Sequence, residues 1–261
     1  GGGISGMLSA LDLANSGYYV YLVEKGPSIG GVMAQLDKTF PTNDCAMWII
    51  SPTLVEVGRH LNIELLTLSE VIDVKGEKGD FQVEILKKPR YVDVDLCVGC
   101  GACTEKCPGK FDDAYNADLT KRTAIYVEYP QAVPLKYAIN PDICLKLTKD
   151  KCGTCEEVCP ANAIDYTQTQ EKVTIEAGSI IFSPGFTPFN PEKFDNYQYA
   201  NYPNVVTSME FERILSATGP TMGHVTTFPK LPLNPKKKKD KLLAQKRKDP
   251  KKIAWFQCVG S

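Results

Sequence analysis

The sequence predicts an α/β protein in which an inserted α+β module interrupts a nucleotide-binding domain. Three observations predict this organisation. A glycine-rich turn opens the chain and is followed by helical and then strand-like patterns within residues 1–24. Eight of the ten cysteines lie between residues 97 and 159. Strand-like segments occur on both sides of this cysteine-rich stretch, as they would if one domain had received an insertion at its surface.

The first predicted element is a helix that begins at the glycine-rich turn. Gly1, Gly3 and Gly6 satisfy the pattern G-x-G-x-x-G. The apolar residues that follow are expected to share one helical face: Ile4, Met7, Leu8 and Leu11. Gly17 is a natural C-terminal cap, because glycine adopts a left-handed conformation without strain. The glycines would let backbone N–H groups approach a pyrophosphate at the N-terminus of the helix.

The second predicted element is a strand over residues 18–23, which are rich in aromatic and β-branched side chains. The strand ends at Glu24, the place where an acidic residue holds the ribose hydroxyls of an adenine dinucleotide. An ordinary tight turn into a helix is the alternative, but the glycines, helix, strand and acid together favour a dinucleotide site. The strand that should precede the first glycine is absent, which predicts that the sequence is a fragment of a longer protein.

Residues 26–90 are predicted to contain a loop, a helix and three strands. The loop carries Gly30 and Gly31, a glycine pair that lies close to the cofactor in flavoprotein reductases. The polar stretch that ends at Cys45 is expected to be irregular. Cys45 itself is a candidate metal ligand or redox thiol, although a lone cysteine is more often buried and inert. A short helix is expected over residues 54–59. Strands are expected over residues 63–66, 71–74 and 81–86.

The cysteine-rich stretch contains two runs, with the spacings C-x2-C-x2-C-x3-C-P and C-x7-C-x2-C-x3-C-P. The first run extends from Cys97 to Pro108 and the second from Cys144 to Pro160. In the ferredoxin pattern, three cysteines of one tight loop ligate one 4Fe–4S cluster and the fourth ligates the other. We therefore predict two clusters in an α+β ferredoxin-like domain. One ligand set is Cys97, Cys100, Cys103 and Cys159, and the other is Cys107, Cys144, Cys152 and Cys155.

Three other chemistries for these cysteines explain the pattern less well. Two C-x2-C pairs beside C-x3-C-P are unfavourable for disulfides. A four-cysteine zinc site does not need a second, interlocking quartet or the repeated proline. A thioredoxin-like dithiol at Cys152 and Cys155 would leave the neighbouring cysteines unexplained.

The chain after the cysteines is predicted to return to the first domain. Strands are expected over residues 173–175 and 179–182. A sharp turn at Gly185 would bring the chain back to the cofactor, and a helix is expected over residues 209–216. Residues 253–259 are apolar and predict a buried strand that opens a further domain.

Charge is distributed unevenly along the chain. Residues 230–252 contain eleven Lys or Arg and two Asp, a net charge of +9, while the whole chain carries −1. The remaining residues therefore carry −10. Such a basic run is more often a solvated loop, and this one lacks interleaved aromatic residues, so we expect no nucleic-acid partner. Docking of an acidic partner protein is the alternative.

The composition is that of an ordinary globular protein, with 43% apolar and 23% charged residues. Ten cysteines without a signal peptide predict a reducing compartment, and thus the cytoplasm. No apolar run approaches the ~20 residues of a membrane span, so an integral membrane protein is not expected. His60 and His224 lie far from the cysteines and are expected to be structural or surface residues.

Together these motifs resemble the A subunit family of heterodisulfide reductases. The resemblance rests on the glycine fingerprint, the cysteine runs, the Gly185-Phe186 turn and four sequence segments. The segments are QLDKTFPTNDC (residues 35–45), VGRH-x-NI (residues 57–63), PQAVP (residues 130–134) and FQCVGS (residues 256–261). The family fold is a thioredoxin-reductase-like FAD-binding domain with an inserted two-cluster ferredoxin domain. Domain boundaries are expected as follows: 1–90 and 171–229 for the FAD-binding domain, 91–170 for the insert, 230–252 for the lysine-rich loop, and 253–261 for the start of a truncated domain.

The resemblance also implies cofactor residues, a function and partners. FAD would be held by Gly1, Gly3, Gly6, Glu24, Lys25, Gly30, Gly31 and Gly185. Cys258 would be the first ligand of a further 4Fe–4S cluster. Relatives often carry a second cysteine at the position of Trp48, so its absence here counts against any ligation that needs that cysteine together with Cys45. The family transfers electrons between FAD and clusters and bifurcates them to ferredoxin and a disulfide. Its partners are B and C subunits and hydrogenase or formate dehydrogenase subunits, in a complex expected to form a dimer.

No catalytic acid or base is expected, because the cofactors supply the chemistry. Backbone N–H groups of the cysteine loops are expected to donate hydrogen bonds to sulfur. Simple electron relay remains an alternative to bifurcation. Two further alternatives are an NAD(P)H-dependent iron–sulfur flavoprotein reductase, although no second glycine fingerprint is present, and a structural zinc-binding scaffold.

Overall fold

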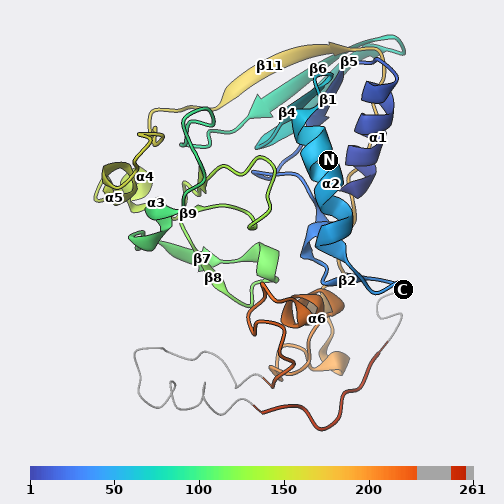
Figure 1. Cartoon of the computed structure of the whole chain (residues 1–261), viewed down its shortest axis with the longest axis vertical. Helices are drawn as coiled ribbons and strands as arrows, with labels where there is room; N and C mark the ends of the chain where they lie inside the picture. Colours follow the sequence, from blue (N-terminus) through green and yellow to red (C-terminus); the bar gives the residue numbers. More distant parts are fainter. Residues whose placement is uncertain (228–247, 257–261) are drawn as a thin grey trace.

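The computed structural model describes residues 1–227 and 248–256 of the chain. Figure 1 shows helices α1 and α2 beside the strands β1, β4, β5, β6 and β11, a region of short elements to one side, and α6 at the opposite end. None of the described helices is both long and apolar enough to cross a bilayer. The predicted lysine-rich loop lies mostly outside the described residues.

The chain begins with helix α1 (Ile4–Asn15), capped by Gly3. Gly17 follows the helix with a φ of +91°, as the prediction of a glycine cap requires. The buried face of α1 contains Met7, Ala10, Leu11 and Ala14. The expectation that Leu8 shares this face is wrong. The buried residues follow the helical spacing that runs from Met7 through Leu11 to Ala14, and Leu8 lies beside this stripe, 48% exposed.

Strand β1 (Val20–Val23) pairs in parallel with β4 (Ile63–Leu66). The predicted strand over residues 18–23 therefore starts two residues later, and Tyr18 and Tyr19 are exposed. The β4 prediction is confirmed. Helix α1 follows the glycine turn and contacts both strands, which is the start of a Rossmann-like arrangement.

Helix α2 (Ala46–Arg59) is more than twice as long as the helix expected over residues 54–59, and it includes Pro52. Its buried residues recur at helical spacing, and their burial stabilises the helix by more than the proline destabilises it. They are Ala46, Ile50, Leu54 and Val57. Before α2 lie a 3-10 turn, η1 (Val32–Gln35), and the short antiparallel strands β2 (Lys38–Thr39) and β3 (Asp44–Cys45). The stretch that ends at Cys45 is thus partly ordered as strands.

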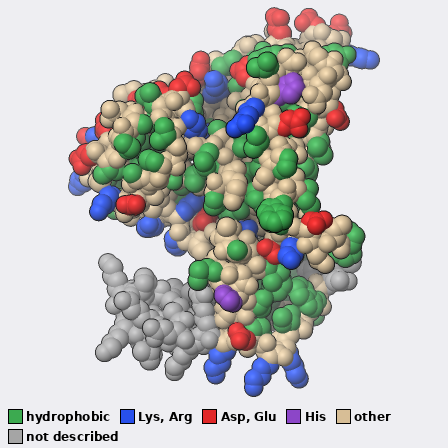
Figure 2. All heavy atoms as spheres, in the orientation of Figure 1, with side chains coloured by type: hydrophobic (Ala, Val, Ile, Leu, Met, Phe, Trp, Pro, Cys, Tyr) green, Lys and Arg blue, Asp and Glu red, His purple; other side chains and the backbone are tan. Residues whose placement is uncertain are grey.

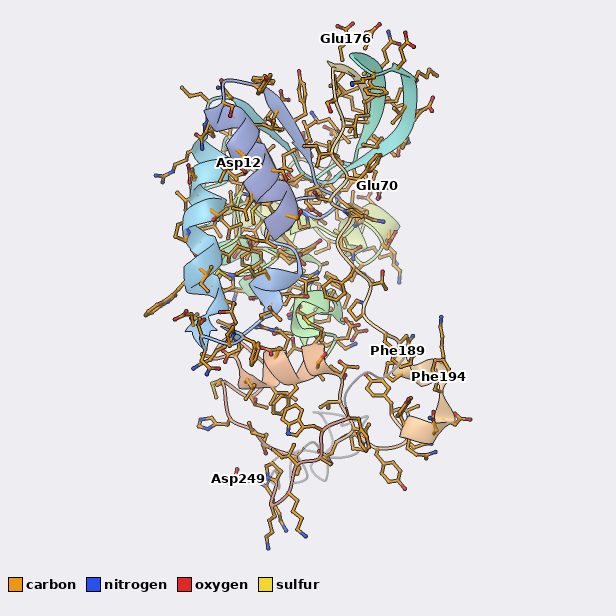
Figure 3. The ribbon with its side chains drawn as sticks, turned by 90° about the vertical axis from the view of Figure 1, so that its right-hand side faces the viewer. Asp12, Glu70, Glu176, Phe189, Phe194 and Asp249 are labelled. Carbon is orange, nitrogen blue, oxygen red and sulfur yellow. The ribbon has the colours of Figure 1, made fainter. Side chains whose placement is uncertain are left out.

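A three-stranded antiparallel sheet has the order β11-β6-β5. Its strands are β5 (Ser69–Glu77), β6 (Asp80–Lys87) and β11 (Glu171–Ala177), at the strand positions that the sequence predicts. Acidic side chains gather at its tip, at the top of Figure 2, where Figure 3 labels Glu176. The strand predicted over residues 179–182 is absent from the described structure, because this segment has no strand beside it and Phe182 is 82% exposed.

Between β6 and β11 the chain forms the cysteine-rich region. Its helical segments are α3 (Ala102–Glu105), η2 (Ala114–Asn116), α4 (Leu145–Lys149) and α5 (Thr154–Glu157). Two small antiparallel ladders join β7 (Lys110–Asp112) to β8 (Lys121–Thr123) and β9 (Ile125–Tyr126) to β10 (Ala138–Ile139). An isolated bridge between Val92 and Ile164 joins the two ends of the region.

The last described part contains two 3-10 turns, η3 (Pro191–Lys193) and η4 (Asp195–Tyr197), and helix α6 (Ser208–Leu215). Phe189 and Phe194, labelled in Figure 3, stack with ring centroids 5.1 Å apart. The expectation of a buried strand over residues 253–259 is wrong for its described part, because residues 253–256 are exposed and form no strand. Residues 257–259 lie outside the described chain.

One hydrophobic core joins the first part of the chain to the cysteine-rich region. Members from the first part include Met7, Leu11, Leu22, Ile29, Ile50, Leu54 and Val57. Tyr115, Tyr129 and Ala132, from between β6 and β11, belong to the same core. The two tyrosine rings stack 5.3 Å apart, and a β-bridge pairs Ile29 with Val133.

Candidate functional site

The glycine fingerprint forms a turn that leaves no room for side chains at two of its positions. A Cβ atom at Gly6 would lie 1.9 Å from the carbonyl oxygen of Gly1. A Cβ atom at Gly1 would lie 2.4 Å from the carbonyl oxygen of Ser183. Gly3 differs, because the nearest atom to a Cβ there is 3.9 Å away. The turn therefore needs Gly1 and Gly6 for its own packing and leaves room for a Cβ atom at Gly3.

The Gly30-Gly31 loop lies against this turn. The Gly30 N–H donates to the carbonyl oxygen of Gly2 at 2.8 Å. Gly31 has a φ of +57°, and a Cβ atom there would lie 2.8 Å from the Cα of Gly3. Gly185, with a φ of +72°, follows two residues after Ser183, which contacts the same turn. Three segments distant in sequence thus lie together, and each contains a predicted FAD residue.

Glu24 orders the same turn through its carboxylate. Its Oε2 accepts the Gly2 N–H at 2.6 Å and its Oε1 accepts the Gly26 N–H at 2.7 Å. A carboxylate has about four lone-pair sites, so capacity for ribose hydroxyls remains. The neighbouring Lys25 is 78% exposed and lies 3.4 Å from Glu70, with which it forms a surface ion pair.

Ser28 is a residue of this site that sequence reasoning missed. Its hydroxyl is buried and has no hydrogen-bond partner within the described part of the chain. A buried hydroxyl without a partner costs free energy, so a bound polar group would stabilise this arrangement. Nothing in the sequence distinguishes Ser28 from other loop serines. The glycine cradle, the Glu24 carboxylate and this hydroxyl together fit a dinucleotide.

The four cysteines of the first predicted ligand set line one small cavity. Cys97, Cys100 and Cys103 come from the loop that leads into α3, and Cys159 comes from the end of the α5 segment. Figure 1 shows α3 close to α4 and α5, and α3 contacts α5 directly. Two loops more than fifty residues apart therefore face the same space.

The second predicted set is brought together in part. Cys144 and Cys155 are buried in one apolar cluster, against which Cys107 packs. Burial raises the pKa of the Cys155 thiol, and the nearby Cys144 and Cys107 thiols raise it further. Cys152 is half-buried, and hydrogen bonding from Thr154 lowers its pKa. Two of the four, Cys144 and Cys155, are thus buried, and Cys107 and Cys152 are half-buried.

Burial also affects the first set, in which Cys97 and Cys103 are buried and Cys100 is exposed. It raises the pKa of the Cys103 thiol to about 12, with added repulsion from Cys155, Cys97 and Cys100. Cluster binding requires thiolates, so these thiols must release protons when iron binds.

Two hydrogen-bond partners of the cysteine sulfurs lie outside the cysteine loops. The Ala163 N–H donates to Cys159 Sγ at 3.3 Å. The Tyr166 hydroxyl lies 2.9 Å from Cys155 Sγ. Backbone donors were expected within the cysteine loops themselves, and no sequence pattern indicated Ala163 or Tyr166. Hydrogen bonds of this kind tune the potential of a cluster.

The cysteines are unpaired in the part of the chain that the structure describes. None of the nine described cysteines forms a disulfide, which contradicts the disulfide alternative. Within residues 1–227 and 248–256, no three His, Cys, Asp or Glu side chains are close enough to hold a single metal ion. Cys45 is half-buried at the end of β3 and belongs to neither set. Cys258 lies outside the described residues.

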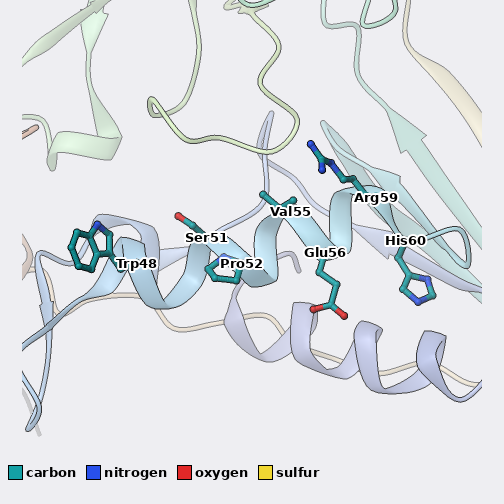
Figure 4. A pocket seen from close by; sticks show the side chains of 7 residues that line it. All are labelled: Trp48, Ser51, Pro52, Val55, Glu56, Arg59 and His60. Carbon is teal, nitrogen blue, oxygen red and sulfur yellow. The ribbon is translucent and has the colours of Figure 1, made fainter.

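A wide surface hollow lies along α2 and contains none of the predicted cofactor residues (Figure 4). Its lining includes Trp48, Val55 and Arg59, all on one side of the helix. Trp48 is 82% exposed. The hollow is open to solvent and shares no lining residue with the cavity between the cysteines.

Comparison with known proteins gives two domain matches. Residues 90–111 and 150–165 match a family model described as a 4Fe-4S binding domain. Residues 1–53 match one described as an NAD(P)-binding Rossmann-like domain. The chain therefore combines a Rossmann-like dinucleotide-binding domain with a ferredoxin-type 4Fe–4S domain.

Similar proteins extend over the whole chain. It is 45% identical over 261 residues to the iron-sulfur A subunit of the CoB--CoM heterodisulfide reductase of Methanocaldococcus jannaschii, with all of this chain and 36% of that protein covered. It is 43% identical over the same length to the A subunit of the H(2):CoB-CoM heterodisulfide,ferredoxin reductase of Methanothermobacter thermautotrophicus, again with 36% of the relative covered. The chain thus spans just over a third of these relatives. Among solved structures, L-proline dehydrogenase from P. horikoshii covers 33% of this chain and 17% of its own, at 25% identity and a TM-score of 0.28.

Proposed function

The chain belongs to the family of heterodisulfide reductase A subunits, and from that premise we propose that it forms the part of an electron-transfer flavoprotein that holds FAD and two 4Fe–4S clusters. The observation that carries the proposal is the cavity lined by Cys97, Cys100, Cys103 and Cys159. The fourth cysteine of the second run faces the first three of the first run. This is the exchange of ligands that a two-cluster ferredoxin makes.

The second ligand set would be Cys107, Cys144, Cys152 and Cys155, and Cys258 would contribute to a further cluster. The chain would tune the potentials of its clusters by burial and by the polar contacts of Ala163 and Tyr166. Cys103, Cys144 and Cys155 are buried, so water would have little access to much of both clusters.

FAD would lie at the turn where the three glycine segments meet. Backbone N–H groups beside Gly3 would contact the pyrophosphate, and the Glu24 carboxylate would accept from the ribose. Gly30, Gly31 and Gly185 would let the backbone approach the cofactor, and Lys25 would lie at the rim. FAD, when bound, supplies the conversion between two-electron and one-electron transfer. The residues of this chain bind and orient it and need not provide an acid or base.

The names of the relatives suggest the wider reaction. One is named for the CoB–CoM heterodisulfide and another for hydrogen, the heterodisulfide and ferredoxin. We propose that this chain works with B and C subunits, a hydrogenase or formate dehydrogenase, and ferredoxin, in a dimer of the complex. Electron bifurcation to ferredoxin and a disulfide is the proposed role.

A second candidate is a nicotinamide dinucleotide in place of FAD. The match of residues 1–53 to an NAD(P)-binding model favours it. Extraction of the bound nucleotide distinguishes the two, because only FAD gives a flavin absorbance band at about 450 nm. A colourless nicotinamide in stoichiometric amount would overturn the FAD assignment.

The test of the cluster proposal is metal and flavin analysis of protein purified without oxygen. We expect roughly eight irons per copy of these residues, as two cubanes require. Cys100→Ala should remove the electron paramagnetic resonance signal of one cluster and leave flavin content close to wild type. Cys45→Ala is the matched control and should keep both signals. Zinc in place of iron, or loss of flavin with both cluster signals intact, would overturn the proposal.

A further inference from the structure

Arg90 links the two candidate sites through a buried guanidinium. The residue is 7% exposed and lies just after β6, where the chain enters the cysteine-rich region. Its Nη2 donates to the carbonyl oxygen of Pro27 at 2.6 Å and to the Thr67 hydroxyl at 2.8 Å. Its Nη1 donates to the carbonyl oxygen of Lys136 at 3.2 Å. One side chain therefore contacts the loop that leads to Gly30 and also the segment beside the cysteines.

The contact continues from Lys136 to the first cysteine loop. The Lys136 Nζ donates to the carbonyl oxygen of Cys97 at 2.6 Å. Gly99 packs on the same segment, since a Cβ atom there would lie 3.0 Å from the carbonyl oxygen of Leu135. Tyr137, next in the chain, lines the cavity between the cysteines. Arg90 is thus one hydrogen-bonded residue away from the first ligand set.

The charge of Arg90 has no carboxylate partner within the described residues. No ion pair within 4.0 Å involves it, and the acceptors named above are neutral oxygens. Burial lowers its pKa to about 10, which still leaves it charged at neutral pH. A buried cation without a counter-ion is costly, and chains retain one where a negative group compensates it.

We propose that Arg90 is a positioning residue that couples the dinucleotide site to the cluster held by Cys97, Cys100, Cys103 and Cys159. This rests on the function proposed above. Its hydrogen bonds hold the Pro27 loop against the Lys136 segment. Its positive charge raises the reduction potential of that cluster, because reduction adds negative charge in a medium of low dielectric constant.

The test compares three arginine variants of the holoprotein by redox titration followed by electron paramagnetic resonance, together with flavin content after gel filtration. Arg90→Met should lower the potential of one cluster by about 59 mV or more, which is a tenfold change in the one-electron equilibrium. Arg90→Lys keeps the positive charge, so its cluster potential should stay close to the wild-type value. Both variants should retain less flavin, because neither side chain reproduces the fork that reaches Pro27 and Thr67.

Arg213→Met is the matched control. Arg213 is 1% exposed, and its guanidinium donates to Gln35, Asn116 and Thr218, none of which belongs to a cysteine loop. Its loss should destabilise the fold and leave both cluster potentials unchanged. If Arg90→Met does not accumulate as folded protein, Thr67→Val tests the same link. That variant should lose flavin while the cluster potentials stay at the wild-type values.

The outcomes separate this proposal from the proposed function. A full complement of iron with wild-type potentials and flavin retention in Arg90→Met would overturn the role of Arg90 and leave the cluster proposal standing. An equal fall in potential in Arg90→Lys and Arg213→Met would also overturn it, because a general loosening of the fold would then explain the change. Wild-type protein without iron would overturn both.

Discussion

At the scale of single residues, Gly3 and Gly6 belong to one turn and differ in the space that a side chain would have. Gly6 has a carbonyl oxygen where a Cβ atom would lie, so the turn cannot form with a larger residue. Gly3 has room for a Cβ atom, which would lie 3.9 Å from the Cα of Gly31, and a φ of −76°, which any residue adopts. Nothing within the turn excludes a Cβ atom at Gly3, and under the proposed function a pyrophosphate would approach the backbone there.

This difference predicts that two alanine variants lose different properties, folding stability in one case and flavin retention in the other. Gly6→Ala should lower the free energy of unfolding by about 3 kcal/mol, near the upper end of what overpacking costs, as measured by urea denaturation. Gly3→Ala should lower it by less than about 1 kcal/mol, the scale of a lost N-cap preference. Gly3→Ala should nevertheless retain less flavin after gel filtration, because its methyl group occupies the approach to the turn. Wild-type flavin content in a folded Gly3→Ala protein would show that the cofactor lies elsewhere.

The same scale shows which site residues a sequence can reveal. Cysteine spacing predicts the first quartet because its ligands lie in two short loops whose geometry depends on local residues. Ser28, Tyr166 and Arg90 carry no such pattern. Arg90 acts on a segment 46 positions later, Tyr166 contacts a cysteine eleven positions earlier without a recognisable spacing, and the Ser28 hydroxyl is distinguished only by its burial without a partner. Periodicity and spacing describe neighbours in sequence, so these residues could not be predicted.

At the scale of elements, helix α6 fixes the segment that follows the Gly30-Gly31 loop. The Glu212 carboxylate accepts the Asp37 N–H at 2.9 Å, and Arg213 donates to the carbonyl oxygen of Gln35 at 2.9 Å. The helix begins with a capping box, in which Thr207 and Glu210 satisfy each other's backbone N–H groups. The order of residues 35–37 therefore depends on a helix more than 170 positions later.

Removal of this cap should weaken the fold measurably. Thr207→Ala should cost about 1 kcal/mol of unfolding free energy, the usual cost of losing an N-cap side chain. Ser208→Ala is the matched control, since this exposed neighbour does not cap the helix, and it should change stability by less than about 0.5 kcal/mol. Equal effects of the two substitutions in urea denaturation would contradict a capping role for Thr207.

The helices and strands also show which secondary structure can be predicted from sequence pattern and residue propensity. The sequence predicts β4 and places β5, β6, β11 and α6 within a few residues, because alternation and helical spacing are local properties. It underestimates α2, where tertiary burial of Ile50 and Leu54 stabilises a helix that contains a proline. It overestimates a strand at residues 179–182, because a strand needs a neighbour and the sequence does not say whether one is present.

At the scale of the whole molecule, the order of segments along the chain suggests two parts, whereas the hydrophobic core is shared between them. The cysteine-rich region leaves from β6 and returns to β11, and the last pair of that ladder joins Lys87 to Glu171. By chain connectivity it has the form of an insertion. Tyr115, Tyr129 and Ala132 from this region nevertheless pack in one core with Met7 and the rest of the first part. The domain boundaries at residues 90 and 170 stay a prediction, and residues from both sides of them pack in one core.

This shared core predicts that the two parts do not fold independently. Replacing residues 88–170 with an Asn-Gly turn would let β6 and β11 close as a hairpin. It would also remove Tyr115 and Tyr129, which are 6% and 4% exposed. Loss of one large buried aromatic side chain costs about 3–5 kcal/mol, and a domain of this kind has a total of only about 5–15 kcal/mol. We therefore expect the shortened chain to lack a cooperative urea transition and to bind no flavin. Tyr129→Phe in the intact chain, which keeps the ring and removes only its hydroxyl, should stay folded. A shortened chain that folds cooperatively and retains flavin would show that the dinucleotide part is self-sufficient, and that the contacts of the cysteine-rich region with it serve only to place the clusters.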